Sequence, residues 1–579
     1  MKKNRIAALF LAALCGASMV GCGGGGNGGG NGGGNENKNN VEDPNKTTIT
    51  IANYDGGIGS VWLDEAAERF ATIHKDDHYE QGKTGVYVDV QRAAGITMEN
   101  ILNETVNIYI SEKKDVSSLA QNGEFLDITD IVKDETRVGG SLESAIKSNK
   151  LDSLKGNDGK YYGLPHYEFF GGLSYDKEVF DKNRAYFAAA SEAGAMNYNC
   201  KYGQAKFVTS LDMAKSNGPD GTAGTYDDGL PSTMQELIIL MQYFKDRVSG
   251  YKPVALSGLY NNYSNYFFEG LWASLAGYQQ MLNYYNCEGE IDVVTGYTNE
   301  PIFPGISYIK KPVVSKVTLN GSNGYLGNDM AAKYYAIAML EIMHKEGFFT
   351  NGSGTSSVDH YGAQKTILYN PISSQYEKCA MLLEASYWYN EATIAGSIDS
   401  YNLLAGTTAP RDVRFMALPS AWDSSDVQAP SKNTIMDIGF GALVVNGNIA
   451  NKPAILEAVK EFVSFLYSEE ELKNFTLNTG MTRPIDCTVG NDEIVSLPLF
   501  SQNMYKMTAE SNIVYYAGTT SAFKQAKGYL KLTLVLPKAI KIGTEYNNYL
   551  TPIKAGSATQ ALFDATKYSA AEWANIYKA

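Results

Sequence analysis

The first stretch of the chain with a folding pattern alternates apolar and polar residues. Isoleucine and threonine alternate over Thr48–Ile51, which is the two-residue period of a strand with one buried face. A glycine-rich segment, 53–60, follows and allows backbone angles and close approaches that a Cβ would forbid. Apolar residues then recur with the spacing of a helix, at Leu63, Ala66, Ala67 and Phe70. The pattern predicts a strand, a glycine-rich loop and a helix.

This loop is a candidate ligand-binding segment. In an open α/β sheet it follows the carboxyl end of its strand, where such folds bind ligands. We therefore expect Tyr54, Asp55 and Trp62 at the rim of a cleft. The alternative is that the glycines only form a tight connection and that Trp62 packs in the core. The loop lacks the G-x-G-x-x-G and G-K-[ST] orders, which argues against nucleotide phosphate binding.

The rest of the chain divides into regions of different pattern. Strand-like and helix-like segments alternate over 47–165, which indicates an α/β lobe. A second region, 168–436, is rich in tyrosine and phenylalanine and has helical patterns at 231–245 and 330–344. A further helix is predicted at 453–466, with Pro453 suited to its first turn.

Aromatic residues gather in two segments of the second region. Tyr260–Tyr278 is the densest of these segments. Cys379–Ala392 is predicted to be an apolar strand that opens into Tyr387, Trp388 and Tyr389. Aromatic rings at the end of a strand suit a platform on which a ligand stacks.

The N-terminus has the features of an exported lipoprotein. Three basic residues precede Ile6–Leu14, an apolar run too short to span a bilayer, which predicts a signal peptide over 1–21. Ser18–Cys22 resembles the bacterial lipobox, in which cleavage leaves Cys22 as the lipid-bearing N-terminus. The following residues, to 46, are dominated by glycine and asparagine and are expected to form a flexible tether. The alternative is cleavage elsewhere and a free secreted protein.

Composition narrows the number of domains and the kind of partner. A chain of 579 residues is too long for one ordinary core, so about two to four domains or lobes are expected. A formal net charge of −14 disfavours a nucleic-acid partner and also disfavours an anionic substrate. Tyrosine is abundant, with 40 copies against 22 phenylalanines and 5 tryptophans, and its ring and hydroxyl suit sugars. The alternative is that many tyrosines simply fill the lobes.

Cysteine and aspartate offer weaker candidate sites. The four cysteines beyond the leader are too few and too far apart for a zinc site or a disulfide scaffold, although a pair could be bridged. Asn217–Gly229 places Asp220, Asp227 and Asp228 in a glycine-rich loop, where they could hold a structural calcium ion. Their order does not match the EF-hand loop, and a solvated turn is the alternative.

Several blocks, in this order, resemble the extracellular solute-binding proteins of family 1, the sugar-binding receptor lipoproteins of ABC importers. They are ITIANYDGGIGSVWLDEAAERF, DGKYYGLPHYEFFGGLSYDKEVF, LPSTMQEL, AMLLEASYWYNEA, VRFMALP and KPAILEAVKEFVSFLYSEEELKNFTLNTGMTRP. The resemblance covers most of the chain from Thr47 to about Tyr516.

The resemblance implies a fold and a division into lobes. The implied fold is α/β and two-lobed, of the periplasmic-binding-protein-like type II, with the lobes joined by crossing hinge strands. The N-terminal lobe is expected to comprise 47–164 and 437–505, and the C-terminal lobe 165–436 and 506–579. Crossings are expected near 164–167, 418–439 and 505–522.

The resemblance also implies ligand contacts. In maltodextrin-type members an aromatic residue begins a helix that ends in a Gly–aromatic pair, and Tyr266 holds that place here. Trp388 matches the tryptophan of the strand-end aromatic motif, so both rings are expected to stack on pyranose faces. Asn53, Asp55 and Glu391 are expected to hydrogen-bond sugar hydroxyls. Further contacts are predicted at Tyr54, Trp62, Tyr167 and Tyr389.

The function implied is capture of an oligosaccharide and its delivery to ABC permease subunits, without catalysis. The receptor is expected to be a monomer, tethered by its lipid to the extracytoplasmic face of the cell membrane, and to need no cofactor. Two alternatives stay open. The same fold could bind a peptide or another polar solute, or the chain could be a surface glycoside hydrolase that uses two carboxylates.

Overall fold

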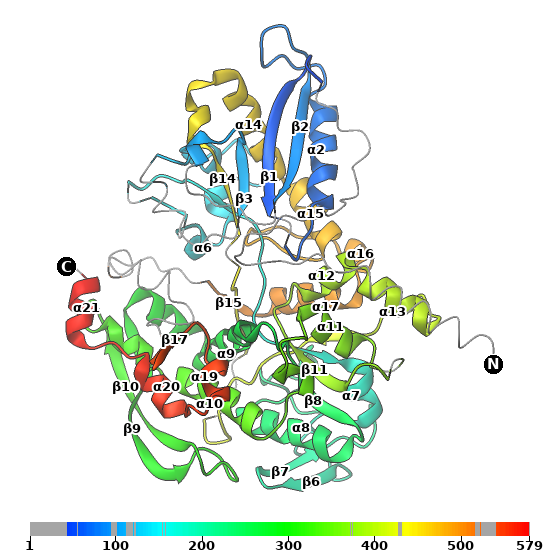
Figure 1. Cartoon of the computed structure of the whole chain (residues 1–579), viewed down its shortest axis with the longest axis vertical. Coiled ribbons are helices and arrows are strands. Elements are labelled where there is room, and N and C mark those ends of the chain that lie inside the picture. Colours follow the sequence, from blue (N-terminus) through cyan, green and yellow to red (C-terminus); the bar gives the residue numbers. More distant parts are fainter. Residues whose placement is uncertain are drawn as a thin grey trace.

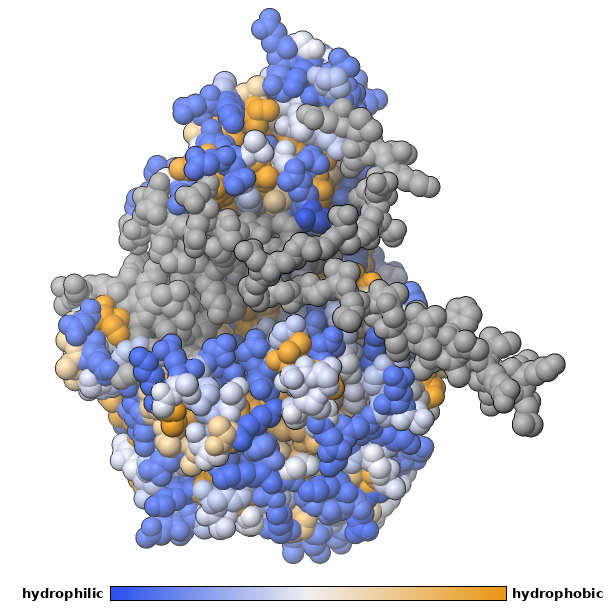
Figure 2. Space-filling view, in the orientation of Figure 1, coloured by the Kyte–Doolittle hydropathy of each residue, from blue (hydrophilic) through white to orange (hydrophobic). Residues whose placement is uncertain are grey.

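The computed structural model describes residues 43–54, 56–93, 101–111, 120, 123–152, 154–156, 158–370, 372, 374–426, 431–439, 441–515, 522 and 540–577. The predicted leader, Cys22 and Asp55 lie outside these residues. The chain forms two α/β lobes, stacked along the long axis of the molecule (Figure 1). Hydrophilic residues dominate the visible face of both lobes, with scattered apolar ones between them (Figure 2).

The first lobe is built on a five-stranded sheet. Its strand order is β2–β1–β3–β14–β4, and β1 (Thr47–Tyr54) pairs in parallel with both β2 (Val86–Ala93) and β3 (Ile108–Ser111). The last two strands, β14 (Ala442–Val445) and β4 (Leu164–Pro165), are antiparallel to their neighbours. Residue 442 follows residue 165 by almost half the chain, so two strands of this sheet are separated in sequence by most of the second lobe.

Helices cover the sheet as the apolar periodicity predicts. α2 (Val61–Ile73) buries Leu63, Ala66, Ala67 and Phe70. α14 (Pro453–Leu466) packs beside α2, and the rings of Phe70 and Phe462 have centroids 4.9 Å apart. α15 (Glu469–Thr479) follows, with Gly480 ending it in the left-handed conformation. The other helices of the first lobe are α4 (Thr129–Val132), α5 (Leu142–Ala145) and α6 (Ser148–Asp152).

Three segments cross between the lobes. The first follows β4 and reaches Phe169, whose carbonyl accepts a hydrogen bond from the Ile438 N–H at 2.9 Å. The second runs from β13 (Thr434–Met436) to β14, and the third lies between α15 and α17 (Leu499–Glu510). β15 (Asn512–Val514) follows α17 and pairs in parallel with β13. α17 already packs on the second lobe, because Phe415 N–H donates to Asn503 Oδ1 at 2.9 Å. The chain therefore reaches the second lobe before residue 506.

The second lobe contains a four-stranded sheet. Its order is β12 (Val413–Phe415), β5 (Leu173–Asp176), β11 (Lys378–Leu383) and β8 (Tyr251–Ala255). The two predicted helices are α8 (Met234–Arg247), which starts with a Thr233–Glu236 capping box, and α10 (Ala331–Lys345). Other helices of this lobe are α7 (Lys177–Asn183), α9 (Ser264–Asn286), α11 (His360–Leu368), α12 (Trp388–Ile394), α13 (Ser397–Ala405) and α16 (Asn491–Ile494).

Two hairpins and a C-terminal segment were not predicted in this form. The hairpins are β6–β7 (Met196–Cys200, Gly203–Phe207) and β9–β10 (Gly289–Pro301, Lys310–Leu319). The C-terminal segment forms a short hairpin, β16–β17 (Ile540–Ile542, Thr544–Tyr546), and then α19 (Leu550–Lys554), α20 (Thr559–Ala565) and α21 (Ala570–Ile576). Thr559 donates to the buried Glu341 carboxylate of α10 and so fixes this segment to the lobe.

The described part of the chain shows the state of the cysteines and the length of its apolar helices. Cys200, Cys287, Cys379 and Cys487 are all free thiols. Among the described residues, no helix combines the length and the apolar content needed to span a bilayer.

Candidate functional site

A cavity of about 240 Å³ lies where the first lobe, the first crossing segment and the second lobe meet. The first lobe contributes Tyr54 and the glycine-rich loop, and the crossing segment contributes Tyr167 and Phe169. The second lobe supplies the opposite wall from the segment before α9, from α11 and from the start of α12. The lining residues are Tyr54, Gly56, Gly57, Ile58, Tyr167, Phe169, Tyr260, Asn262, Tyr263, Tyr266, His360, Tyr387 and Glu391.

The glycine-rich loop passes close to the second lobe. Gly57 has φ of 49°, and a Cβ there would lie 2.9 Å from the Tyr387 ring, so the position favours glycine on both counts. The Asn390 side-chain amide donates to the carbonyls of Gly57 and Ile58 at 2.9 and 3.3 Å. The loop therefore serves as a contact between the lobes as well as a wall of the cavity.

Aromatic rings form a continuous row along the second-lobe wall. Tyr260 stacks on Tyr263 with centroids 5.5 Å apart, and Tyr263 lies 5.2 Å from Tyr266. Tyr387 meets Tyr266 edge to face at 6.2 Å and Phe169 at 5.1 Å. Rings held by their neighbours in this way present flat apolar faces to a ligand without first having to become ordered.

One end of the cavity carries its charged group. Glu391 on α12 accepts a hydrogen bond from the Gln364 amide at 2.8 Å, and His360 Nε2 lies 3.5 Å from its other oxygen. The same Gln364 amide also donates to Glu384 at 3.1 Å. Glu384 is buried behind the cavity, and both its burial and the charge of Glu391 hold its pKa well above the usual range. Burial therefore favours the protonated form of Glu384.

Solved structures share this architecture. A structure named as a "probable secreted solute-binding lipoprotein" from Streptomyces coelicolor is 12% identical, with a TM-score of 0.50, and the match covers 91% of this chain and 98% of that one. The chain has the fold of the extracellular solute-binding proteins. The predicted two-lobed α/β fold is therefore confirmed.

Two further structures match to a similar degree. A chitin oligosaccharide binding protein has 13% identity and a TM-score of 0.50, and the match covers 90% of this chain and 97% of that one. A structure from work on xylan utilization by Caldanaerobius polysaccharolyticus has 14% identity and a TM-score of 0.50, covering 90% and 99%. No family model and no curated protein sequence matches the chain.

Within this solute-binding-protein fold, the cavity brings together four of the predicted contacts, Tyr54, Tyr167, Tyr266 and Glu391. Trp388 does not join them. It is fully buried, its indole N–H donates to Ser174 Oγ at 2.8 Å, and its ring packs on Phe500. Tyr389 is also buried and stacks on Phe500, with centroids 4.8 Å apart. The predicted ligand contacts at Trp388 and Tyr389 are thus corrected to core positions.

Trp62 and Asn53 are core residues of the first lobe. Trp62 is 4% exposed and packs against His166, Phe475 and the Arg483 guanidinium, as the alternative reading of the glycine loop anticipated. Asn53 is 1% exposed, and its amide donates to the Gly59 carbonyl and to Ser60 Oγ at 3.2 and 2.9 Å. Asn53 therefore shapes the loop from below instead of facing the cavity. Asp55 lies outside the described residues.

Of the three tyrosines that precede or begin α9 in this wall, Tyr266 was predicted as a contact, while Tyr260 and Tyr263 were not, although the sequence contained a signal for them. Tyr260, Tyr263 and Tyr266 are three residues apart, the spacing that aligns side chains on one face of a 3₁₀ turn continuing into a helix. Tyr387 was recognised as part of an aromatic triad, but α12 begins directly after it. Each helical residue turns by about 100°, so Tyr387 faces the cavity while Trp388 faces the core.

The acidic loop uses its carboxylates to fix its own conformation. Asp227 accepts hydrogen bonds from the Asp220 N–H at 3.1 Å and from Asn433 at 3.0 Å, and Asp228 accepts one from the Gly224 N–H at 2.8 Å. Burial, and to a lesser extent the neighbouring aspartates, raise the pKa of Asp220 to about 6. Among the described residues, these aspartates do not form a group of three ligating atoms within 4.8 Å. Calcium binding by this loop stays a prediction.

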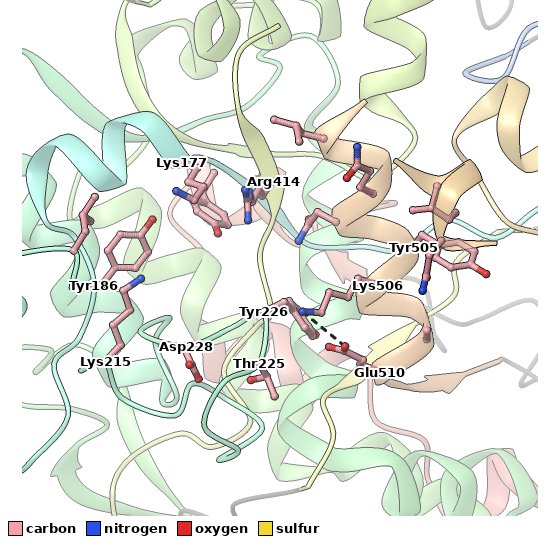
Figure 3. Close-up of a pocket in the computed structure, with 18 of the residues that line it drawn as sticks. Lys177, Tyr186, Lys215, Thr225, Tyr226, Asp228, Arg414, Tyr505, Lys506 and Glu510 are labelled. Carbon is pink, nitrogen blue, oxygen red and sulfur yellow. Dashed lines mark ion pairs between the residues drawn. The ribbon is translucent and has the colours of Figure 1, made fainter. Parts of the chain in front are cut away.

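Another cavity, of about 940 Å³, lies in the second lobe between β5, β12 and α17 (Figure 3). Lysines and Arg414 point toward it, but they have carboxylate partners nearby. Arg414 makes a two-pronged contact with Asp412 at 2.9 and 3.0 Å, Lys177 pairs with Asp181, and Lys506 lies 3.9 Å from Glu510. Because it shares no lining residue with the cavity between the lobes, we do not assign the solute to it.

Proposed function

We propose that the chain is a lipid-anchored solute-binding receptor that captures a carbohydrate, preferably an oligosaccharide, between its lobes and delivers it to an ABC import permease. It acts as a monomer on the extracytoplasmic face of the cell membrane. It binds the solute and releases it chemically unchanged, and it requires no cofactor, with structural calcium in the 217–229 loop as an added prediction.

The lining of the cavity between the lobes is the observation that carries this proposal. Six tyrosines and one phenylalanine supply ring faces, while Glu391, His360 and Asn262 supply polar atoms. No lysine or arginine lies among the described lining residues, so an anionic ligand would lack a counter-charge. A neutral molecule with flat C–H faces and hydroxyl edges fits this lining best, and a sugar ring has both features.

Ring stacking and hydrogen bonding would both contribute to sugar binding. Each ring stack contributes roughly 0.5–1.5 kcal/mol beyond the burial of apolar area. Buried hydrogen-bonding groups at the polar end add selectivity, because a ligand that lacks a matching hydroxyl leaves them unpaired. Hinge closure about the three crossing segments would enclose the sugar, as in other two-lobed binding proteins.

The N-terminal sequence and the structural neighbours support the proposed transport function and membrane anchoring. The lipobox-like Ser18–Cys22 segment and the glycine-rich spacer favour attachment through acyl chains, including palmitate, at Cys22. The S. coelicolor structure with the same fold is itself named as a "probable secreted solute-binding lipoprotein". The chitin oligosaccharide binding protein supports a carbohydrate as the solute.

Isothermal titration of the purified protein against neutral oligosaccharides tests the proposal. The panel would contain chitin-, xylan-, raffinose- and maltodextrin-type sugars, with oligopeptides and charged sugars as comparison ligands. We expect saturable binding of at least one neutral sugar and weaker or no binding of acidic sugars. Binding of peptides with flat traces for every sugar would contradict the carbohydrate assignment while leaving the fold assignment in place.

A hydrolase remains the alternative from another class. Glu391 and Glu384 are two neighbouring carboxyl groups, both bonded to Gln364, and a pair of carboxyl groups is a feature of glycosidases. Glu384, however, is buried and does not line the cavity. Incubation of labelled oligosaccharide with a small amount of protein distinguishes the two functions, since repeated cleavage would establish an enzyme and recovery of intact sugar supports a receptor.

A further inference from the structure

A second cluster of polar side chains lies in the first lobe, far in sequence from the cavity. Four polar groups converge at the seam between α2 and α14. His74 Nδ1 lies 2.7 Å from Asp77 Oδ2, 3.1 Å from the Tyr79 hydroxyl and 3.6 Å from Glu461 Oε2. The Tyr79 hydroxyl also donates to the Glu461 carboxylate. Among the described residues, this is the one group of three histidine, cysteine or acidic side chains with ligating atoms within 4.8 Å.

We propose that His74, Asp77 and Glu461 form a binding site for a divalent transition-metal ion of the zinc type. His74 Nδ1 carries at most one proton, so it can donate to only one of the two carboxylates at a time. A metal ion between them interacts with the imidazole nitrogen and with both carboxylates. One nitrogen and two carboxylate donors, with water in the remaining position, suit zinc and its neighbours in the first transition row.

The spacing of the donors fits such an ion. Zinc binds nitrogen and oxygen at about 2.0–2.2 Å, which places tetrahedral ligands roughly 3.3 Å from each other. The separations from His74 Nδ1, 2.7 to 3.6 Å, lie on both sides of this value. Side-chain adjustments of a few tenths of an ångström would therefore complete the site.

The backbone and the core hold the donors in place. The His74 ring packs on the Phe70 ring with centroids 4.2 Å apart. The backbone N–H of His74 caps the helix by donating to the Phe70 carbonyl at 3.0 Å. Asp77 is fixed by its own N–H, which donates to the His74 carbonyl, and by its carbonyl, which accepts from Gly85 at 2.7 Å. Glu461 is on α14, which packs against α2. The donors are thus attached to elements whose positions the core already determines.

The surrounding charge also favours a cation. Asp77 and Glu461 place two carboxylate groups within 3.6 Å of His74 Nδ1. A bound ion would join residues 74–77 to residue 461, which are separated by nearly four hundred positions in the chain. An ion that binds only the folded protein stabilises the folded state by mass action. The bound ion would therefore stabilise the first lobe.

Zinc titration of the untagged protein, after treatment with a chelator, tests the site by calorimetry and by thermal unfolding. We expect one zinc ion per chain and a higher melting temperature with zinc. Glu461→Gln and His74→Gln should weaken zinc binding by about tenfold or more, since even changes to groups behind metal ligands cost about 10–100-fold. Glu461→Gln keeps the size and hydrogen-bonding capacity of the side chain, so it should remain folded.

His78→Gln is the matched control. His78 is a neighbouring surface histidine whose Nδ1 contacts the Lys83 carbonyl at 3.0 Å, outside the cluster. This variant should bind zinc as the unchanged protein does. The proposal is overturned if the unchanged protein shows no zinc binding, or if Glu461→Gln and His74→Gln bind zinc as tightly as His78→Gln. In either case the cluster is only a set of ion pairs between two helices.

Discussion

Lys150 of the first lobe and Asp437 of the second crossing segment form a buried ion pair. Lys150 Nζ lies 2.5 Å from Asp437 Oδ2 and 2.6 Å from the Gly439 carbonyl. The Asp437 side chain is fully buried, and its other oxygen accepts hydrogen bonds from the N–H groups of Phe169 and Gly439. One carboxylate thus ties α6, the first crossing segment and the second crossing segment together.

The third crossing segment joins the same cluster through Thr482, which donates to Glu168 of the first crossing segment at 2.7 Å. The Glu168 carboxylate also accepts hydrogen bonds from Lys147 at 3.2 Å and from Tyr515, which follows β15. All three crossing segments therefore meet in one polar network at the hinge. Because buried polar networks cost free energy when one member is lost, the hinge should be sensitive to single substitutions.

Lys150→Met should lower the free energy of unfolding by about 3–5 kcal/mol, because it leaves the Asp437 carboxylate buried without its counter-charge. Urea denaturation of the variant and the unchanged protein measures this difference. Lys155→Met is the control, since the Lys155–Asp152 pair at 3.5 Å is partly exposed and should contribute about 1 kcal/mol or less. Equal losses in the two variants would contradict the role assigned to the buried pair.

Tyr387→Ala and Trp388→Ala should affect different properties, although the residues are adjacent. Tyr387→Ala removes a wall of the cavity and should weaken sugar binding by about tenfold or more. Trp388→Ala removes a buried core side chain and should lower stability by about 3–5 kcal/mol.

The affinity of the folded Trp388→Ala protein for sugar should stay close to that of the unchanged protein. Calorimetry and thermal unfolding of both variants check this separation. If Trp388→Ala selectively abolished binding without a loss of stability, the stacking role first predicted for Trp388 would be restored.

Gly57→Ala should weaken ligand binding more than Gly396→Ala does. Both glycines have positive φ, 49° and 69°, so both substitutions carry a backbone cost of about 1 kcal/mol. Only at Gly57 does the new Cβ meet another group, the Tyr387 ring at 2.9 Å, while at Gly396 it meets nothing within 4 Å. The comparison of affinities, with melting temperatures as a check, isolates the steric effect on the cavity. Equal affinities would show that the loop can move away without cost.

Glu384→Gln should change the pH dependence of stability. The pKa of Glu384 is raised in the folded protein, so the folded state keeps a proton that the unfolded chain releases above its ordinary pKa of about 4.5. The Glu384 contribution to stability is therefore fully present below that ordinary value and is lost as pH rises toward the raised pKa.

Glutamine cannot lose this proton, so the variant should gain stability relative to the unchanged protein between pH 5 and pH 8. Urea denaturation at the two pH values measures the gain. Glu300→Gln, at an exposed strand position, serves as the control and should show no such trend. A difference between the Glu384 variant and the unchanged protein that does not vary with pH would contradict a buried neutral carboxyl group.

Local patterns predicted the elements that depend on neighbouring residues. The alternation before Ala52 and the helical spacing of Leu63 to Phe70 correspond to β1 and α2, and the predicted helices correspond to α8, α10 and α14 within a few residues. The crossing near residue 164 also follows β4 as expected. The hairpin β9–β10 was missed, because many of its positions are exposed and lack an apolar alternation.

The sequence by itself determined the order of strand, glycine-rich loop and helix, the α/β character of the first lobe and the concentration of aromatic residues in the second region, since these follow from periodicity and residue type over short distances. The two-lobed arrangement was implied by the family resemblance. The tertiary structure alone decided which aromatic side chains form the wall of the cavity. Tyr387 and Trp388 are adjacent, but one residue of rotation at the start of α12 points Tyr387 to the cavity and Trp388 to the core. Tyr54 likewise lines the cavity, while Asn53 and Trp62 point into the first lobe. Those directions depend on Ser174, Phe475 and Phe500, partners distant in sequence that become neighbours only when the lobes have packed.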